Sequence, residues 1–444
     1  MSQAPQQPRW SSLALIRLNA FSFGVTGFIL AMDTAVLPVI ILSLAPESLK
    51  NTYLAMLGIG GLLVAAVVQP MIGRLSDRTR SPLGRRVPYI IFGITVVCGS
   101  LALLAVAPNW AALFGVWMFI QANLNIAYGP GMALIRDLVP RDRIGVASSV
   151  KILLDAVGGL VMITASAALI GLGQRVGAEL GPLPVYVDWE WAVLLVLGAA
   201  LVVSVAVTCA TVLARDPRRR ARPVRRGDVS AKRVLDLQLG LFLLSRLFLM
   251  TAIYAFPTYG LFFLKDVVEA QNPAQTLSQM IPAIGGSLAV AVYAAGWASD
   301  RIGRKPVVMA GAAAGAISTA WLLTVDTPAG VVATASVIGA SAGTLLSANW
   351  ALANELGDEQ QAGVHIGIVN LSTIGGAALP RLFGPVIDLL NHTAEDLGYR
   401  ALIGGCAALF VIGALTLMPV NPSRRQQSGG EESANPTTIQ PPRS

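Results

Sequence analysis

The stretch GRLSDRTRSPLGRRVP (residues 73–88) places five arginines and one aspartate between two long apolar runs. Elsewhere the chain avoids charge, because 54% of its residues are hydrophobic and only 13% are charged. Soluble domains carry about 25% charged residues, so a single soluble core does not accommodate this composition. The sequence therefore indicates an integral membrane protein, and the cationic stretch marks a turn between two membrane spans.

Twelve apolar runs follow one another along the chain, each with the roughly 20 residues that a helix needs to cross a ~30 Å hydrocarbon core. They are continuous and rich in Ala, Leu and Gly, without the ~10-residue alternating segments of a spanning barrel. We predict an all-α protein with twelve transmembrane helices. The first run is longer than a signal-peptide core, so we expect it to remain in the mature protein. The runs lie near residues 15–42, 53–73, 87–107, 110–135, 145–171, 190–213, 237–264, 278–298, 306–325, 329–353, 364–390 and 399–419.

Most of the 32 Lys and Arg residues fall in alternate loops, in the set that includes residues 73–88. The insertion machinery keeps such loops on the cytoplasmic side. We therefore expect a multi-pass protein of the cell (plasma) membrane with both termini in the cytoplasm. This topology explains the formal charge of +8, so we expect no nucleic-acid partner.

A polar, basic segment, RDPRRRARPVRRGDVSAKR (residues 215–233), separates the sixth run from the seventh. Its charge is typical of a juxtamembrane segment near anionic lipid headgroups. The tail after Pro419 is of low complexity, and we expect it to be disordered. We therefore divide the chain into a cytoplasmic tail (1–12), a first six-helix bundle (13–213), a basic linker (214–235), a second six-helix bundle (236–420) and a second cytoplasmic tail (421–444).

The motif of the opening stretch recurs later in the chain, at a constant offset of 223 residues. The pattern G-x-x-S-D-R occupies residues 73–78 and again residues 296–301, and Gly with two basic residues follows each copy. The first copy carries four extra residues. The chain therefore holds two copies of one six-helix unit. The residues of interest are Gly73, Asp77, Arg78, Gly84, Arg85 and Arg86 in the first copy, and Gly296, Asp300, Arg301, Gly303, Arg304 and Lys305 in the second.

The repeated motif, in these two loops of a twelve-span chain with a basic central linker, resembles the major facilitator superfamily over roughly residues 12–420. Within it, SDRTRSPLGRRVPYI and NIAYGPGMALIRDLVP are similar to the sucrose and glycoside–pentoside–hexuronide cation symporters. The resemblance implies two pseudo-symmetric bundles and a secondary transporter that works by alternating access. We expect a small-molecule substrate, the lipid bilayer as surroundings, a monomer, and no enzyme activity.

The resemblance also gives the motif a role as a cytoplasmic latch. A carboxylate is stabilised at the positive N-terminal end of a helix. In the family geometry Asp77 would approach the eleventh span near Gly363, and Asp300 would approach the fifth near Gly145. The alternative is that the arginines only enforce topology, which explains neither the glycines nor the repeated aspartates. The expected inner ion pairs join Arg78, Arg85 and Arg86 to Asp137, and Arg301, Arg304 and Lys305 to Glu355.

Ionisable residues inside the predicted spans are few, and a charge in the bilayer core is costly enough to be usually kept for function. Asp33 has no basic neighbour in its own helix, and Pro38 lies one turn on, where we expect a bend. Burial favours the protonated form of an isolated carboxylate, which suits a group that carries one proton per cycle. Proton coupling at Asp33 is one hypothesis, and the alternatives are a static pair with Arg246 or another base, or a hydrogen bond to substrate.

The other intramembrane charges leave two partner choices open. Lys151 and Asp155 are four residues apart on one helix face, where they are able to neutralise each other. Alternatively, Asp155 and Arg246 lie near mid-span in opposite bundles and exchange partners during transport. Arg381 lies in LPRLFGP, whose prolines and glycine indicate a broken helix, and its partner is either Asp388 or substrate.

Polar uncharged residues in the spans outline a candidate sugar site. Amides bond hydroxyl groups as donors and acceptors together, and aromatic rings stack on the apolar face of a pyranose. The alternative for each residue is packing between helices, and His365 near the cytoplasm is either similar or simply solvated. The candidate cavity residues are Gln121, Asn125, Tyr128, Tyr254, Ser347, Trp350, Asn354 and Asn370.

The coupling ion marks a departure from the resemblance. Sodium-coupled melibiose-type members carry paired acids in the second and fourth spans, whereas here the second span has none and the fourth has none before Asp137. We therefore expect protons rather than sodium, with no metal or other cofactor. Two other functions stay open: an exporter of small amphipathic compounds, and a non-transporting pigment or membrane-complex assembly factor, because LGRRVPYI also resembles a stretch of the light-harvesting assembly branch.

Overall fold

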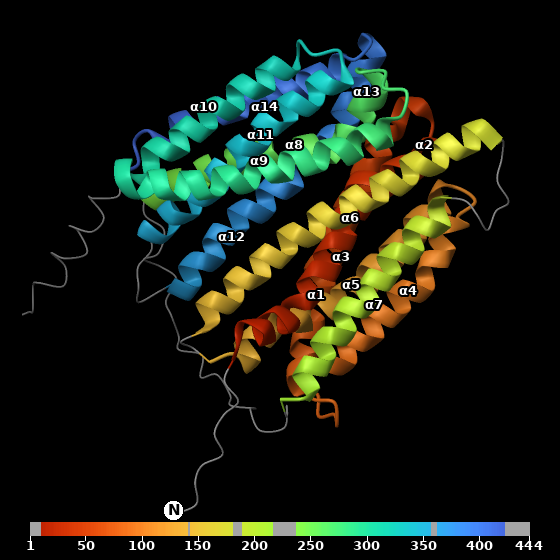
Figure 1. Cartoon of the computed structure of the whole chain (residues 1–444), viewed down its shortest axis with the longest axis vertical. Coiled ribbons are helices and arrows are strands. Elements are labelled where there is room, and N and C mark those ends of the chain that lie inside the picture. The colour runs from red at the N-terminus through yellow and green to blue at the C-terminus, as the bar shows by residue number, and fades with distance from the viewer. Residues whose placement is uncertain (1–9, 141–142, 181–188, 216–236, 357–361, 422–444) are drawn as a thin grey trace, which may run out of the picture.

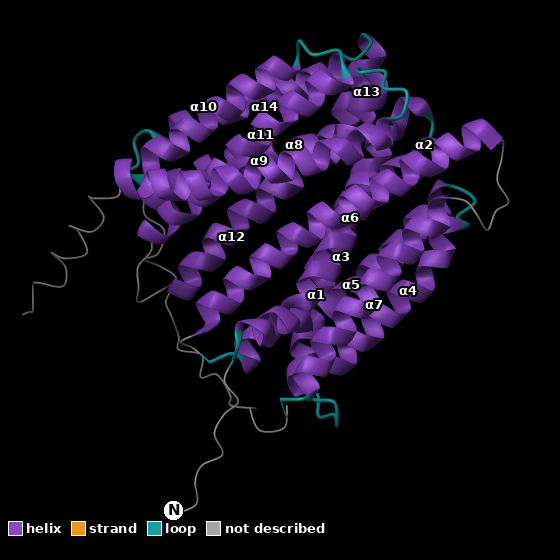
Figure 2. Ribbon diagram, viewed as in Figure 1, coloured by secondary structure: helices purple, strands orange, loops and turns teal. Residues whose placement is uncertain are grey.

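The computed structural model describes residues 10–140, 143–180, 189–215, 237–356 and 362–421. Every regular element among these residues is helical (Figure 2), which confirms the all-α prediction. Eleven of the described helical segments are long and apolar enough to cross a membrane. The predicted run near residues 306–325 is the helix α10 (Arg304–Leu322), which is rich in Ala and Gly and is not among those eleven.

The helices fall into two groups around residues 216–236, and we call them the first half and the second half. The first half holds α1 (Ser12–Ala31), η1 (Met32–Val36), α2 (Leu37–Leu44), η2 (Glu47–Leu49), α3 (Lys50–Arg78), α4 (Val87–Ala105), α5 (Trp110–Leu138), α6 (Ile144–Leu180) and α7 (Trp189–Leu213). The second half holds α8 (Leu237–Asp266), α9 (Pro273–Ile302), α10, α11 (Pro328–Glu355), α12 (Ala362–Ala378), η8 (Leu379–Phe383), α13 (Gly384–Thr393) and α14 (Leu397–Leu417). The predicted linker and both tails lie mostly outside the described residues.

Two spans are interrupted by a different helical geometry. In the first span the π-helical segment η1 precedes Pro38, whose ring and missing N–H disturb the α-helical ladder. In the eleventh span the 3-10 segment η8 contains Pro380. Both expected irregularities are therefore present. Asp33 lies in η1 and Arg381 in η8, so each of these charges lies where the regular helix is interrupted.

The two halves are joined at one end of the molecule. Helix α6 contacts α9, α3 contacts η8 and α13, and η1 contacts α8. One apolar core runs through the first half and continues into Tyr259, Leu322 and Ile387 of the second. A separate apolar cluster, with Phe242 and Leu352 among its members, belongs to the second half alone. Among the described residues, the shared core therefore ties the halves together toward the end that carries α2 and α13, at the upper right of Figure 1.

The two ends of the molecule carry different loops, and we name each end by what it carries. The network side is the end that carries residues 45–50, 266–272 and 394–396, and it is named for the network of polar contacts that lies there. The motif side is the opposite end, which carries the α3–α4 loop (residues 79–86) and the α9–α10 turn at Gly303. In Figure 1 the α3–α4 loop lies at the bottom and the α9–α10 turn at the left edge, so the two copies of the motif are far apart.

Candidate functional site

A polar cavity of about 150 Å³ lies among α1, η1, α3 and α5 of the first half. One lining residue, Arg381, reaches it from the second half. The structure therefore brings the three candidate cavity residues of α5 together with two of the intramembrane charges. The polar lining residues are Asp33, Gln69, Gln121, Asn125, Tyr128 and Arg381.

An ion pair across the two halves closes one wall of this cavity. Arg381 Nη2 donates to Asp33 Oδ2 at 2.6 Å. Gly58 of α3 makes room for the pair, since a Cβ there would lie 2.4 Å from Arg381 Cδ. Tyr259 of α8 donates to the carbonyl oxygen of Arg381 at 3.3 Å, which holds η8 in position. Asp33 is thus not isolated, and the expected pairing of Arg381 with Asp388 is not the arrangement found.

Amide side chains continue the cavity wall on α3 and α5. Gln69 Nε2 donates to Asn125 Oδ1 at 2.6 Å, and Asn125 Nδ2 donates to the carbonyl oxygen of Gln121 at 2.8 Å. The ring of Tyr128 lies 6.5 Å from that of Phe21, centre to centre. The sequence analysis missed Gln69. The signal was available, because Gln69 is the single amide side chain in the apolar second run, residues 53–73.

A second charged pair lies on α6, wholly inside the first half. Lys151 Nζ is 2.5 Å from Asp155 Oδ2, and Thr26 of α1 donates to Asp155 Oδ1 at 2.7 Å. Of the two partners considered for Asp155, the structure therefore has Lys151, four residues away on the same helix. Asp155 and Arg246 do not pair with each other in this structure.

Arg246 of α8 is buried in the second half, and its hydrogen-bond partners among the described residues are neutral. Its Nε and Nη2 atoms donate to Thr373 Oγ1 at 3.3 and 3.1 Å, and its Nη1 atom donates to Asn349 Oδ1. The guanidinium carbon lies 5.2 Å from the centre of the Trp350 ring. The amide nitrogen of Asn349 is buried without a hydrogen-bond partner in the described structure. Free donors therefore lie next to the candidate residue Trp350.

Among the remaining candidate cavity residues, Tyr254, Ser347 and Trp350 do not line this cavity. Tyr254 is half-buried on α8, two turns beyond Arg246. Ser347 faces Gly296 of α9, where its hydroxyl would lie 3.6 Å from a Cβ, so it packs between helices. Three further residues belong to α11 and α12, but their side chains lie outside the described part of the structure. These are Asn354, His365 and Asn370.

On the motif side, the first copy of the motif forms ion pairs inside the first half. Arg86 lies 2.6 Å from Asp77 and 2.9 Å from Asp137. Arg85 lies 2.6 Å from the other oxygen of Asp137. The expected contacts of these two arginines with Asp137 are thus present. Arg78, expected to join them, makes no ion pair or hydrogen bond with a described residue.

The second copy is held by a different set of contacts. Arg304 lies 3.2 Å from Glu355, whereas Lys305 donates to backbone carbonyls after the end of α14 and Arg301 lies 3.9 Å from the centre of the Trp297 ring. Of the three bases expected at Glu355, only Arg304 reaches it among the described residues, because the other two have these contacts instead. The two copies share one backbone feature, a glycine with positive φ at Gly84 and Gly303, where a side chain would be strained.

On the motif side, the described residues make none of the contacts expected between the halves. Asp77 bonds Arg86 of its own half, and Asp300 is exposed. A Cβ at Gly145, near the start of α6, would meet no atom within 4 Å. The surroundings of Gly363 lie outside the described side chains. Each described ion pair of the motif residues therefore stays within one half.

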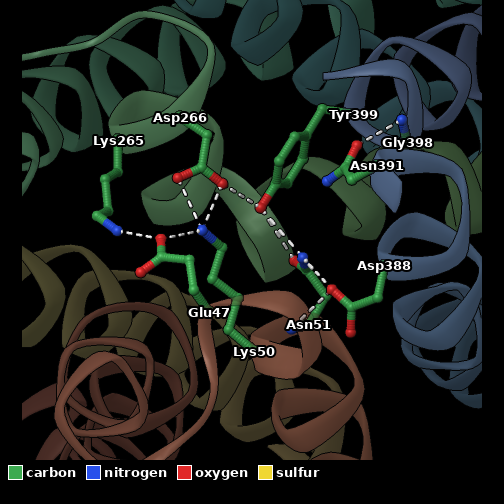
Figure 3. A network of polar contacts seen from close by, with 9 residues as sticks. All are labelled: Glu47, Lys50, Asn51, Lys265, Asp266, Asp388, Asn391, Gly398 and Tyr399. Atoms are coloured by element: carbon green, nitrogen blue, oxygen red, sulfur yellow. Dashed lines mark hydrogen bonds and ion pairs between the residues drawn. The ribbon is translucent and has the colours of Figure 1, made fainter. Parts of the chain in front are cut away.

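The halves are bonded to each other on the network side (Figure 3), and of these residues the sequence analysis named only Asp388, as a possible partner of Arg381. Lys50, at the start of α3, is almost fully buried and lies 2.7 Å from Asp266, at the end of α8. Glu47 lies 2.9 Å from Lys50 and also pairs with Lys265 of the second half. Charges of both signs are thus shared across the boundary between the halves.

Asp388 of α13 forms the second part of this network. Its carboxylate accepts from Asn51 Nδ2 at 2.8 Å, from the Thr52 backbone N–H at 2.7 Å and from the Thr52 hydroxyl at 2.6 Å. The Tyr399 hydroxyl donates to Asp266 at 2.7 Å and accepts from Asn51 at 3.1 Å, which links the two parts (Figure 3). A carboxylate of one half therefore sits at the positive end of a helix of the other half. That arrangement was expected on the motif side, and it occurs on the opposite side.

An open cavity of about 430 Å³ borders the network, with Asp266, His392 and Glu395 in its lining. Burial, and then the carboxylates of Asp266 and Glu395, raise the pKa of Asp396 in the turn between α13 and α14. Among the described residues, no group of three or more His, Cys, Asp and Glu side chains is arranged to hold a metal ion.

The sequence places this architecture in a known class of membrane protein. A family profile for the Major Facilitator Superfamily matches residues 23–380 and 247–442. The chain therefore belongs to the Major Facilitator Superfamily. This is a family of membrane transporters rather than enzymes, and the eleven described apolar helices agree with a multi-pass membrane protein.

Proteins similar to this chain include plant sucrose transport proteins. Sucrose transport protein SUT5 of Oryza sativa subsp. indica is 28% identical over 113 residues, which are 20% of this chain and 21% of that protein. Sucrose transport protein SUC4 of Arabidopsis thaliana is 27% identical over 177 residues, which are 36% of this chain and 34% of that protein. The matched stretches thus span about a fifth to a third of the length of these relatives.

Solved structures share the fold over nearly the whole chain at low identity. A nucleoside transporter, NupG, has a TM-score of 0.64 at 15% identity and covers 92% of this chain and 99% of its own. A bacterial homologue of the iron transporter ferroportin, in an inward-facing state, has a TM-score of 0.65 at 13% identity and covers 93% of this chain and 99% of its own. At such identities the likeness shows the fold and carries no statement about the substrate.

Proposed function

We propose that the protein is a proton-coupled secondary transporter of a sugar or glycoside that works by alternating access. The observation that carries the proposal is the ion pair of Asp33 and Arg381, which joins the two halves beside a cavity lined by amides. The amides of Gln69, Gln121 and Asn125 offer donors and acceptors that match sugar hydroxyls. The partial similarity to sucrose transport proteins supports the same substrate class.

Proton coupling follows from the attraction that this ion pair creates between the two halves. The attraction between Asp33 and Arg381 depends on the negative charge of the carboxylate, so binding of a proton removes it. Arg381, together with η8, is then released from the first half. The neutral carboxyl and the freed guanidinium both bond to hydroxyl groups, so a proton and a sugar are taken up together.

The size of the cavity fits a site that both halves complete. Its volume of about 150 Å³ is below the ~300–1,000 Å³ usual for ligand sites, so the described wall forms one side of the site. In the second half, Trp350 offers an apolar face for a sugar ring, and Asn349 has an unpartnered amide nitrogen. We assign these two residues to the facing wall, which approaches when the halves close on the motif side.

We orient the motif side, with both chain termini, toward the cytoplasm of a cell with the protein in its plasma membrane. The reason is the concentration of Lys and Arg in the loops on that side. With this orientation the structure is an inward-open state, because Lys50 and Asp388 bond the halves on the outer side. The motif then acts as the latch that forms when the cytoplasmic side closes. Protons are preferred to sodium, since the second span holds no acid before Asp77.

Uptake by the purified protein in liposomes tests the proposal. An inward proton gradient is expected to drive accumulation of a radiolabelled sugar from a panel of sugars and glycosides, and an uncoupler is expected to abolish it. Asp33→Asn removes the titrating group, so we expect gradient-driven accumulation to fall by about tenfold or more, while exchange of sugar without a gradient persists. Asp396→Asn, an acid outside the spans, is the control.

A second variant separates the ion pair from the carboxyl group itself. Gly58→Ala places a methyl group where Arg381 crosses to Asp33, so the Arg381 side chain has to move from Cγ outward, whereas no backbone atom is in the way. We expect a normal melting temperature and a several-fold loss of proton-driven uptake. The matched control is Gly115→Ala, where a Cβ meets no atom within 4 Å. Normal accumulation by both Asp33→Asn and Gly58→Ala would remove proton coupling from this site.

The same liposomes separate the two other functions that the sequence leaves open. Wild-type protein that exchanges no sugar but extrudes amphipathic dyes would be an exporter. Protein that moves neither class of solute, although it is folded and correctly inserted, would contradict transport and favour an assembly role.

A further inference from the structure

A larger cavity, of about 610 Å³, lies on the motif side between the α3–α4 loop and the ends of α5 and α7. It shares no lining residue with the cavity at Asp33. Four arginines and two aspartates line it, and none of them lines the candidate sugar site. The proposed transport function uses the motif residues of this cavity as a latch, but it assigns the cavity no ligand.

The arginines of the cavity outnumber the acids that balance them. Asp77 and Asp137 are both paired with Arg85 and Arg86. Arg78 and Arg80 are exposed, and neither makes an ion pair or hydrogen bond with a described residue. Two guanidinium groups, one at the end of α3 and one in the loop that follows it, thus line an open cavity with their donors free.

The second copy of the motif shows that free arginines are not needed to build the turn. There, Arg301 lies over an aromatic ring, Arg304 pairs with Glu355, and Lys305 bonds backbone carbonyls. Arg80 belongs to the longer loop of the first copy and has no counterpart in the second. The longer loop therefore adds a base and a cavity beyond what the repeated turn requires.

The cavity has amphipathic walls and lies where the membrane meets water. The loop joins two candidate spans, Glu47–Arg78 and Val87–Ala105, so it lies at the boundary between membrane and water. Leu134, Leu138 and Val212 form an apolar wall beside the arginines. A cavity with cations on one wall and apolar side chains on another, at this depth, matches a molecule with an anionic head and an apolar tail.

We propose that this cavity binds a phosphate group through Arg78 and Arg80, and that the phosphate belongs to the headgroup of an anionic phospholipid. Guanidinium groups bind phosphate oxygens through paired N–H donors, which suits two arginines that line one cavity. The bound phosphate holds the α3–α4 loop in its present form, in which Asp77 is paired with Arg86 and not with the other half. Lipid occupancy therefore favours the state in which the halves are apart on the motif side.

Lipid binding by the purified full-length protein tests the proposal. The protein in detergent is mixed with equal amounts of phosphatidylglycerol and phosphatidylcholine, and bound lipid is counted by native mass spectrometry. We expect phosphatidylglycerol to be preferred, and Arg78→Gln combined with Arg80→Gln to weaken its binding roughly tenfold. Arg301→Gln removes an exposed base at the corresponding position of the second copy, and we expect it to change binding by less than about twofold.

A second arm identifies the source of the phosphate. Inorganic phosphate is titrated against the protein in detergent, and the melting temperature is followed. Stabilisation that depends on Arg78 and Arg80, without any preference between the two lipids, would keep the phosphate site and assign it to a soluble anion. No arginine-dependent response to either phosphatidylglycerol or inorganic phosphate would overturn the proposal, and so would an equal loss of lipid in Arg301→Gln.

The variants are expected to fold, because Arg78 and Arg80 make no described contact that their loss would break. The melting temperature in lipid-free detergent checks this. If the double variant does not fold, Arg80→Gln alone carries the test, with an expected loss of a few-fold in phosphatidylglycerol binding. Wild-type binding by that folded single variant would then overturn the role of Arg80.

Discussion

The two ends of the molecule use charged residues in opposite ways. On the network side, Lys50 and Asp388 bond from one half to the other. On the motif side, Asp77 and Asp137 are paired within the first half, and Glu355 is paired within the second. The apolar packing follows the same division, because among the described residues the shared core joins the halves toward the network side. The comparison teaches that the partner of a charge, rather than its presence in a loop, tells which side is closed.

The largest expected effect comes from breaking the network at Asp388. Asp388→Ala removes a buried carboxylate and its bonds to Asn51 and Thr52, which costs about 2–5 kcal/mol in the closed form of this side. The population ratio of the two states should therefore change by a factor of about 30 or more. Spin labels on cysteines at the exposed positions Leu49 and Leu397 should show a longer distance across the network side.

Two matched variants separate this effect from a general loss of stability. Asn391→Ala breaks a hydrogen bond to Gly398 on the same side, but inside the second half. Arg86→Gln breaks ion pairs with Asp77 and Asp137, but inside the first half. Both are expected to lower the melting temperature without lengthening the Leu49–Leu397 distance. If either variant lengthened this distance as much as Asp388→Ala does, contacts within one half would matter as much for closing the network side as contacts between the halves.

A smaller effect is expected from a wedge between the halves. At Gly384 of α13 a Cβ would lie 2.4 Å from the carbonyl oxygen of Asn51 in α3, so the backbones have to separate. Gly384→Ala should cost about 1–3 kcal/mol and open the network side. The same label pair measures the opening, and Gly404→Ala, where a Cβ meets nothing within 4 Å, is the control. Equal distances in the two variants would contradict a close contact of α3 with α13.

The smallest effect is expected at the rim of the network. The Glu47 side chain is 69% exposed, and exposed ion pairs contribute about 0–1 kcal/mol. Glu47→Gln should therefore change the population ratio by less than about fivefold, and added salt should remove the difference. A change in the population ratio as large as that of Asp388→Ala would mean that the network depends on its exposed charges instead of its buried ones.

Local features of the sequence predicted much of the fold. The apolar runs predicted the helices because a span is set by the length of a hydrophobic stretch. Pro38 and Pro380 predicted the breaks at η1 and η8, since proline removes a backbone donor wherever it occurs. The contacts of Arg85 and Arg86 with Asp137 followed from the family resemblance, and they stay within one half.

The contacts between the halves were not predictable in the same way. Asp33 and Arg381 are 348 residues apart, and whether they meet depends on how the two halves tilt. Lys50 lies between the first two predicted runs and drew no prediction, and Asp388 was one of two partners considered for Arg381. Their actual partners come from the other half, so no spacing within either helix reveals them. The resemblance implied contacts of Asp77 and Asp300 with the other half, and the described residues do not make them here.

The central claim is that the two sides open and close in opposition. Two distances in the same wild-type protein in lipid nanodiscs test it most directly, one between labels at Leu75 and Ile302 on the motif side and one between labels at Leu49 and Leu397 on the network side. The account predicts two populations in each distance, with every condition that shortens one lengthening the other. Distances that lengthen together, or a motif-side distance that never shortens when the network is broken, would contradict it.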